Sequence, residues 1–98
     1  MEITVNKNGN ELTIIPIGRI DTATAPELQT VVDENISGVT DLTFDLQKLK
    51  YLSSAGLRIL MSTQKIMNKQ GKMRLVHVNE DVMDVLDMTG LTDVFEIE

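Results

Sequence analysis

The sequence predicts a two-layer α/β domain: a mixed, mostly parallel sheet with helices mainly on one face and its first strand antiparallel at an edge. Strand-like and helix-like segments alternate over residues 1–98, without a linker or a repeat. Two strand-like segments alternate apolar and polar residues, so each presents a polar outer face. Right-handed crossovers between sequential parallel strands bring the helices to the opposite face. A chain of 98 residues is long enough for one such domain.

The first segment is predicted to be a β-hairpin. Asn8-Gly9 is a dipeptide typical of two-residue hairpin turns, and apolar and polar residues alternate on both sides of it. With Asn8-Gly9 as the loop, Val5 faces Leu12 and Ile3 faces Ile14. This register collects the apolar side chains of both strands on one face of the hairpin.

A helix and a third strand are predicted next. Thr24 followed by Glu27 matches a capping box, and apolar residues then recur at helical spacing until Gly38 ends the helix. Residues 41–46 alternate polar and apolar side chains, which is typical of a strand with one buried face.

The longest predicted helix begins at Ser53-Ser54-Ala55-Gly56 and runs to about Gln70, where Gly71 ends it. The apolar residues on its predicted core face are Leu57, Leu60, Met61 and Met67. Arg58, Lys65 and Lys69 form a narrow basic stripe on another face.

This basic stripe has two interpretations. It is either an ordinary solvated surface or a docking contact for an acidic partner. Ile59 and Ile66 project roughly opposite to the core face, so that they and the edge strand are possible contact sites for another molecule.

The remainder of the chain is predicted to contain two short strands and a short helix. Residues 73–78 form a strand with apolar side chains on both faces, which indicates that it is more covered than the others. Asn79-Glu80-Asp81 caps a helix that Gly90 ends, and residues 94–97 add a last strand.

Composition favours a binding module in the cytoplasm over an enzyme. The net charge is −6, which disfavours direct contact with nucleic acid. The chain has no cysteine and one histidine, so neither disulfides nor a multi-histidine metal site is expected, and no cofactor is implied. No apolar run approaches the roughly 20 residues that span a membrane, and the start does not resemble a signal peptide.

Two catalytic interpretations are weak. Ser54 follows a strand and opens a helix, as in a nucleophile elbow, but that motif needs a glycine two residues earlier, where Leu52 stands. The single histidine, His77, falls within a predicted strand. Asp45 ends a strand as a phosphoacceptor aspartate does, but the clustered acids and the lysine of such a site are missing. We therefore expect no enzymatic activity.

The serines at the start of the long helix have a structural and a functional interpretation. A serine before a helix commonly caps it, which contributes about 1 kcal/mol. Alternatively, a phosphate added to Ser54 would meet the free N–H groups and the positive end of the helix dipole. Arg58 lies four residues further on and could pair with that phosphate.

Two motifs resemble those of a known family. Gly18-Arg19-Ile20-Asp21-Thr22 and Tyr51-Leu52-Ser53-Ser54-Ala55-Gly56-Leu57 are similar to the signature regions of bacterial anti-sigma factor antagonists, which are STAS-domain proteins. The resemblance covers essentially the whole chain, including the closing Thr89-Gly90-Leu91 turn. It implies a single STAS domain over residues 1–98, with a mixed sheet and helices mainly on one side.

The resemblance also implies a partner-switching mechanism. In this family an unphosphorylated antagonist binds an anti-sigma factor, which is a serine kinase of the histidine-kinase-like ATP-binding fold, and thereby frees a sigma factor. Phosphorylation of the antagonist reverses the binding, and a PP2C-type phosphatase resets it. The family motif is Asp-Ser-Ser-Gly, with the phosphate two residues before the glycine. That residue is Ser54 here, with Ser53 in place of the acid as a secondary candidate.

The implied partner-binding residues lie in the two motifs and just after the second. Asp21 matches the acid that the family places beside the phosphoacceptor, and small Ala55 and Gly56 would let a partner's backbone approach. The expected set is Asp21, Thr22, Ser53, Ser54, Ala55, Gly56 and Arg58. The alternative functions are a non-switching scaffold or a small-ligand sensor in a signalling complex, a domain that regulates a membrane transporter, and, last, a serine hydrolase.

Overall fold

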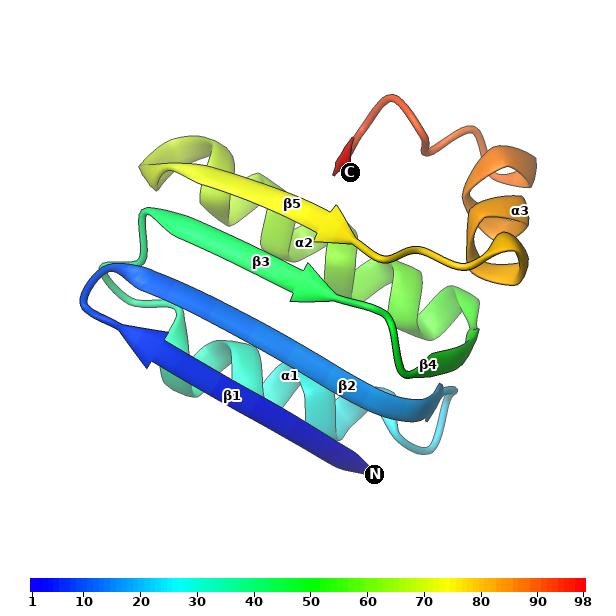
Figure 1. Ribbon diagram of the computed structural model, residues 1–98, viewed down its shortest axis with the longest axis horizontal. Coiled ribbons are helices and arrows are strands. Elements are labelled where there is room, and N and C mark those ends of the chain that lie inside the picture. Colours follow the sequence, from blue (N-terminus) through cyan, green and yellow to red (C-terminus); the bar gives the residue numbers. More distant parts are fainter.

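The computed structural model describes residues 1–98, and it contains six strands and three helices (Figure 1). In chain order they are β1 (Glu2–Asn8), β2 (Glu11–Ile20), α1 (Ala25–Asn35), β3 (Asp41–Asp45), β4 (Leu49–Leu52), α2 (Ser54–Gln70), β5 (Lys72–Val76), α3 (Glu80–Met88) and β6 (Glu96–Ile97). No helix is both long enough and apolar enough to cross a lipid bilayer.

The strands form one mixed sheet in the order β1-β2-β3-β5-β6, and β4 pairs separately with β2. Only the β1–β2 pair is antiparallel, and β1 lies at an edge; the other pairs are parallel. The predicted mixed, mostly parallel sheet with an antiparallel first strand is therefore confirmed.

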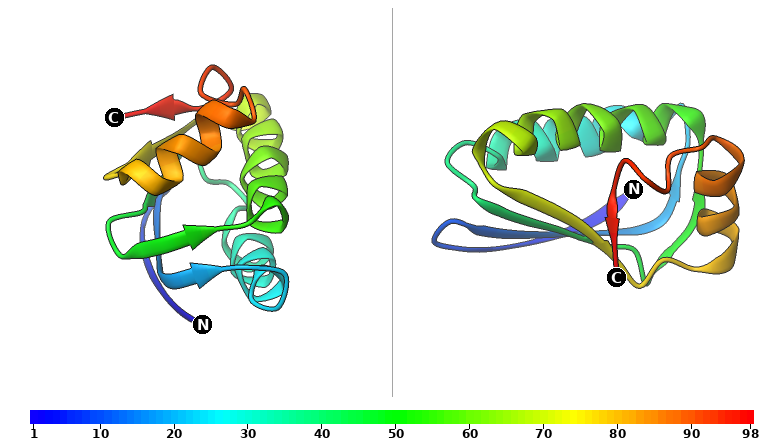
Figure 2. Two further views of the ribbon diagram at one scale, coloured as in Figure 1. Left: turned by 90° about the vertical axis from the view of Figure 1, so that its right-hand side faces the viewer. Right: turned by 90° about the horizontal axis from the view of Figure 1, so that it is seen from above.

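The helices cover one face of the sheet. Figure 2 shows α1 and α2 side by side on that face, while the opposite face carries no helix. Between the layers lies a core of 21 buried apolar residues, including Phe44 and Leu60. α3 lies at the end of the sheet, where it contacts β4. The prediction that the helices lie mainly on one face is thus confirmed: α1 and α2 form that layer, and α3 lies at the end of the sheet.

The hairpin has a different register from the predicted one. Val5 pairs with Ile14, not with Leu12, and the loop is Gly9-Asn10. The predicted Asn-Gly turn needs positive φ at both loop residues, but in this turn only Gly9 has one, at 62°. A glycine with positive φ at the first loop position is typical of a type II′ turn. The pairing therefore shifts by two residues, and because this number is even the apolar side chains of both strands still share one face.

The strand β4 was not predicted. Its four residues include two buried ones, Leu49 and Leu52, with two exposed residues between them, so the alternation of a strand is missing. β2 pairs with β3 as far as Ile14 and with β4 from Gly18 onward, and its register shifts between Gly18 and Arg19. By changing neighbours in this way, β2 ends beside β4.

The strand β5 is shorter than predicted and is not covered on both faces. It ends at Val76 because His77 has a φ of 56°, a left-handed conformation that cannot continue a strand. Its inward residues Met73 and Leu75 are buried, whereas Lys72 and Arg74 lie on the face without helices. The predicted last strand over 94–97 is found only as β6.

Candidate functional site

The two predicted motifs come together at the carboxyl ends of β2 and β4. Ile20 pairs with Leu52 at the last position of each strand, and the Ser53 N–H donates a hydrogen bond of 2.8 Å to the Ile20 carbonyl oxygen. The loop that leads to α1 and the start of α2 therefore lie next to each other. This arrangement brings residues 21–24 close to Ser53 and Ser54.

The start of α2 gives the two serines different surroundings. Ser53 is the N-cap residue, with an extended backbone, and its Oγ accepts a hydrogen bond of 3.3 Å from the Gly56 N–H. Ser54 is the first residue of the helix and is exposed. Its hydroxyl takes part in no hydrogen bond within the chain. The predicted helix start is confirmed, and Ser54 presents the freer hydroxyl.

The first turn of α2 has no acidic residue. α1 carries Glu27 in its first turn, and α3 carries Glu80 and Asp81. Acidic side chains at this position compensate the positive end of a helix dipole. Because α2 lacks them, its amino end remains the place where an added anion would be stabilised.

Asp21 is held in a fixed position by the turn before α1. Its Oδ1 accepts hydrogen bonds of 3.0 Å from the N–H groups of Ala23 and Thr24. The bond from the Thr24 N–H holds the pKa of Asp21 below its ordinary value, although burial opposes this effect. The carboxylate is therefore charged at neutral pH and lies in the loop beside the start of α2.

The capping box predicted for Thr24 and Glu27 is wrong. Thr24 has a helical backbone, at φ −95° and ψ −19°, and its side chain accepts no hydrogen bond from the first turn of α1. Its hydroxyl instead accepts from the Asp21 N–H at 2.9 Å and lies 2.9 Å from the Arg19 carbonyl oxygen. Asp21 and Thr24 thus bond to each other and shape the loop.

Gly56 is buried, contrary to the expectation that its small size admits a partner. A Cβ atom at this position would lie 2.6 Å from Ile20 Cγ2 and 2.5 Å from Leu52 Cδ1. The glycine lets α2 approach the ends of β2 and β4. Its role is in the packing of the chain itself.

The other predicted partner-binding residues lie near the surface. Thr22 and Arg58 are exposed and Ala55 is half-buried. Arg58 takes part in no ion pair, so its guanidinium is available. Ile59, which we expected to project away from the core, is only 7% exposed, whereas Ile66 is 39% exposed. The predicted Ile59/Ile66 contact site is therefore reduced to Ile66.

One feature of this region was missed from the sequence. The Arg19 guanidinium lies over the Tyr51 ring, 4.4 Å from its centre, in a cation–π contact. Tyr51 is 41% exposed and is the only tyrosine of the chain. The pair could not be placed before β4 was known, because β4 brings Tyr51 beside Arg19.

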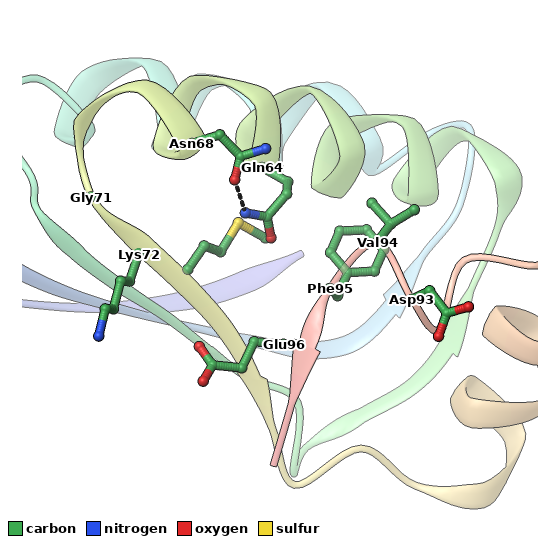
Figure 3. A pocket seen from close by; sticks show the side chains of 9 residues that line it. Gln64, Asn68, Gly71, Lys72, Asp93, Val94, Phe95 and Glu96 are labelled. Atoms are coloured by element: carbon green, nitrogen blue, oxygen red, sulfur yellow. Dashed lines mark hydrogen bonds between the residues drawn. The ribbon is translucent and has the colours of Figure 1, made fainter.

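The region is a surface and not a cleft. The larger of two pockets, of about 440 Å³, lies between α2, β5 and β6 (Figure 3). There Gln64 donates to Asn68 at 2.8 Å, and Phe95 closes one side. The other pocket follows the hairpin. Neither includes a residue of 19–24 or 51–58, and no cluster of side chains suited to a metal ion occurs. An exposed region of this kind is suited to contact with another protein.

Comparisons with known proteins agree with these observations. The STAS domain model matches residues 2–98, and the chain belongs to the STAS family. The anti-sigma-B factor antagonist of Bacillus subtilis is 30% identical over 98 residues, which cover 99% of this chain and 90% of that protein. The expected family resemblance is thus confirmed.

Solved structures show the same fold. The anti-sigma factor antagonist SpoIIAA in its unphosphorylated form matches with a TM-score of 0.85 at 15% identity, over 99% of this chain and 88% of that one. The phosphorylated form of SpoIIAA, a Bacillus cell fate determinant, matches with a TM-score of 0.77 at 14% identity, over 99% and 91%.

Proposed function

We propose that this chain is an anti-sigma factor antagonist that phosphorylation of Ser54 switches off. The observation that carries the proposal is the exposed, unbonded Ser54 hydroxyl at a helix start without acidic residues, in the loop region that also holds Asp21. The 30% identity to the Bacillus subtilis antagonist over nearly the full chain supports the same function. In the unphosphorylated state the chain binds an anti-sigma factor and frees the sigma factor.

The proposed partners follow from the family. The anti-sigma factor is a serine kinase with a histidine-kinase-like ATP-binding fold, and a PP2C-type phosphatase removes the phosphate. The domain over residues 1–98 acts in the cytoplasm, where sigma factors act, and works by binding, not by catalysis. The partner-binding surface consists of Asp21, Thr22, Ser53, Ser54, Ala55 and Arg58.

The switch is electrostatic. A phosphate on Ser54 adds a charge of about −1.5 to −2 near the ionised Asp21 carboxylate. The helix start stabilises this charge in the free protein. A partner that covered the phosphate would strip its hydration without adding a counter-charge of its own, at a cost of several kcal/mol. A cost of about 3 kcal/mol lowers affinity more than 100-fold.

The decisive experiment is a titration with the purified anti-sigma factor kinases of the same organism, one at a time. We expect one of them to bind the wild type and Ser54→Ala equally, and Ser54→Asp about 100-fold more weakly. With ATP, the wild type and Ser53→Ala should each gain about 80 Da, the mass of one phosphate, and Ser54→Ala none.

The matched control is Ser37→Asp, which adds the same charge at an exposed serine in the loop after α1. It should bind like the wild type. Equal affinity of Ser54→Asp and wild type for that kinase would contradict the switch. If none of the kinases binds the wild type, the chain is not an antagonist of this kind.

A specific feature favours one alternative function. The pocket of about 440 Å³ between α2 and β6 is lined by Gln64, whose Oε1 atom is buried and lacks a hydrogen-bond partner (Figure 3). A buried polar atom without a partner is costly unless something satisfies it. If the kinase titrations fail, a non-switching scaffold or small-ligand sensor becomes the better proposal, with this pocket as its ligand site.

A further inference from the structure

The three helices differ sharply in charge. α2 contains three basic residues and no acidic one, although the whole chain has a net charge of −6. α1 contains three acidic residues and α3 contains four, and neither has a basic residue. α2 is therefore the only helix that could attract an acidic molecule.

The basic residues of α2 are Arg58, Lys65 and Lys69, and we call them the α2 ridge. At about 100° per residue they project within roughly 40° of one another, on the side opposite the buried Leu60 and Met67. All three are exposed, and none takes part in an ion pair or a side-chain hydrogen bond. The ridge extends over about 16 Å along the helix axis.

Helix stability alone does not explain the ridge. Lys69 lies in the last turn, where a positive charge interacts favourably with the helix dipole. Arg58 lies near the opposite end, where the same interaction is unfavourable, and Lys65 is in the middle. No acidic residue lies three or four positions from any of them within α2, so pairs along the helix are also missing.

We propose that the α2 ridge is a docking surface for an acidic segment of the anti-sigma factor. This inference rests on the proposed function and extends its surface beyond the loops. A segment that contacts Ser54 and continues along α2 meets Arg58 after one turn and Lys65 and Lys69 beyond it. The acidic residues of α1 and α3 repel the same segment, so the charge pattern favours its binding along α2. Ile66, 39% exposed and next to Lys65, adds an apolar contact.

The ridge also links docking to the switch. Arg58 is four residues after Ser54, a spacing at which side chains on a helix meet. A phosphate on Ser54 would draw the Arg58 guanidinium into a charge-assisted pair. The acidic segment then loses its interaction with Arg58. The phosphate on Ser54 also repels the segment directly.

The first test needs no partner protein. A decaglutamate peptide is titrated into the ¹⁵N-labelled chain at low salt, and amide shifts are followed by NMR. The shifts should concentrate in residues 58–69 and disappear in Lys65→Glu/Lys69→Glu. Equal shifts around Lys7 and Lys72, which lie outside α2, would overturn the proposal.

The second test uses the anti-sigma factor that binds the wild type. Lys65→Glu/Lys69→Glu should weaken binding at least tenfold and reduce its salt dependence. The control Lys7→Glu/Lys72→Glu makes the same charge change outside α2 and should alter affinity less than threefold. Equal losses in the two variants would overturn the ridge and leave the proposed function intact. If no anti-sigma factor binds, the proposed function fails and the peptide titration alone decides the ridge.

Discussion

The starts of α2 and α3 share one capping geometry but differ in the hydrogen bonds of the cap and in the charges of the first helical turn. Both N-cap residues have an extended backbone, and both side chains accept a hydrogen bond from the third residue of the helix. At α3 the bond from the Val82 N–H to Asn79 Oδ1 is 2.8 Å, and Asn79 also donates to the Leu49 carbonyl oxygen at 2.7 Å. At α2 the Ser53 bond is longer, at 3.3 Å.

The difference in charge is larger than the difference in hydrogen bonding. Glu80 and Asp81 compensate the dipole of α3 within its first turn, so this helix start needs nothing from outside. The first turn of α2 holds Ser54, Ala55 and Gly56, with no charge among them. A helix start whose dipole is compensated within the chain and one whose dipole is not can therefore be told apart by their first turns.

The largest expected effect concerns the third helical position. In α3 this residue is Val82, which is 1% exposed. In α2 it is Gly56, where an added Cβ atom would lie 2.6 Å from Ile20 Cγ2 and 2.5 Å from Leu52 Cδ1. Making the two helices alike with Gly56→Val should lower the free energy of unfolding by about 3 kcal/mol or more, because α2 must move off the sheet. Urea unfolding measures this loss.

Ala55→Val adds the same side chain one position earlier and is the control for this prediction. Ala55 is half-buried, so the valine should cost less than about 1 kcal/mol. Similar losses in the two variants would show that the close approach at Gly56 is not what holds α2 in place.

A smaller effect is expected from the caps. Asn79→Ala removes two hydrogen bonds and should cost about 2 kcal/mol, whereas Ser53→Ala removes one long bond and should cost about 0.5–1 kcal/mol. Thermal or urea unfolding of the two variants gives both values. A larger loss for Ser53→Ala would contradict the view that α3 is the more firmly capped helix.

The smallest expected effect on stability concerns Asp21, whose carboxylate accepts hydrogen bonds from the loop that precedes α1. In the folded state the pKa of Asp21 lies below its ordinary value of 3.8, so the folded state binds fewer protons than the unfolded state around that pH. Its contribution to stability is complete well above pH 3.8 and is lost as the pH falls through the lowered pKa. Asp21→Asn should therefore have a flatter acid limb than the wild type.

Urea unfolding between pH 7 and pH 3 tests this prediction. The variants Ser53→Ala and Asn79→Ala lack only neutral caps and should retain the wild-type slope. Asp45 also has a lowered pKa: burial raises it, but hydrogen bonds from His77 and Gln47 outweigh that effect. Some acid sensitivity therefore remains in every variant. Parallel curves for Asp21→Asn and the wild type would contradict the assignment to Asp21.

Features that depend on local signals were predicted correctly from the sequence. The starts of α2 and α3 follow from Ser53 and Asn79, residues whose side chains cap the turn that they precede. The one-sided sheet follows from alternating apolar residues, which do not depend on where the partner strand lies. The position of Ser54 at the start of α2 follows from the same local signal.

Features that depend on distant residues were predicted incorrectly or missed. β4 lacks the alternation of buried and exposed residues that is typical of a strand. It forms because β2 extends past β3 and pairs with β4, which cannot be predicted from the residues of β4 alone. Thr24 lacks its expected cap because Asp21 and Arg19 offer its hydroxyl other partners. Gly56 was assigned to a partner's approach because the strands that close over it were not yet placed.

The hydrogen bond from the Ser53 N–H to the Ile20 carbonyl oxygen has a consequence for binding kinetics. It joins the residue just before the proposed phosphorylation site to β2, the strand that pairs with β1, β3 and β4. An amide bonded in this way exchanges with solvent only when this hydrogen bond opens, by local or by global unfolding. We therefore expect the start of α2 to be ordered before a partner arrives, which limits the conformational entropy lost on association. Recognition can then proceed at the rate set by the mutual orientation of two preformed surfaces, and the proposed phosphate on Ser54 would act mainly by shortening the lifetime of the complex.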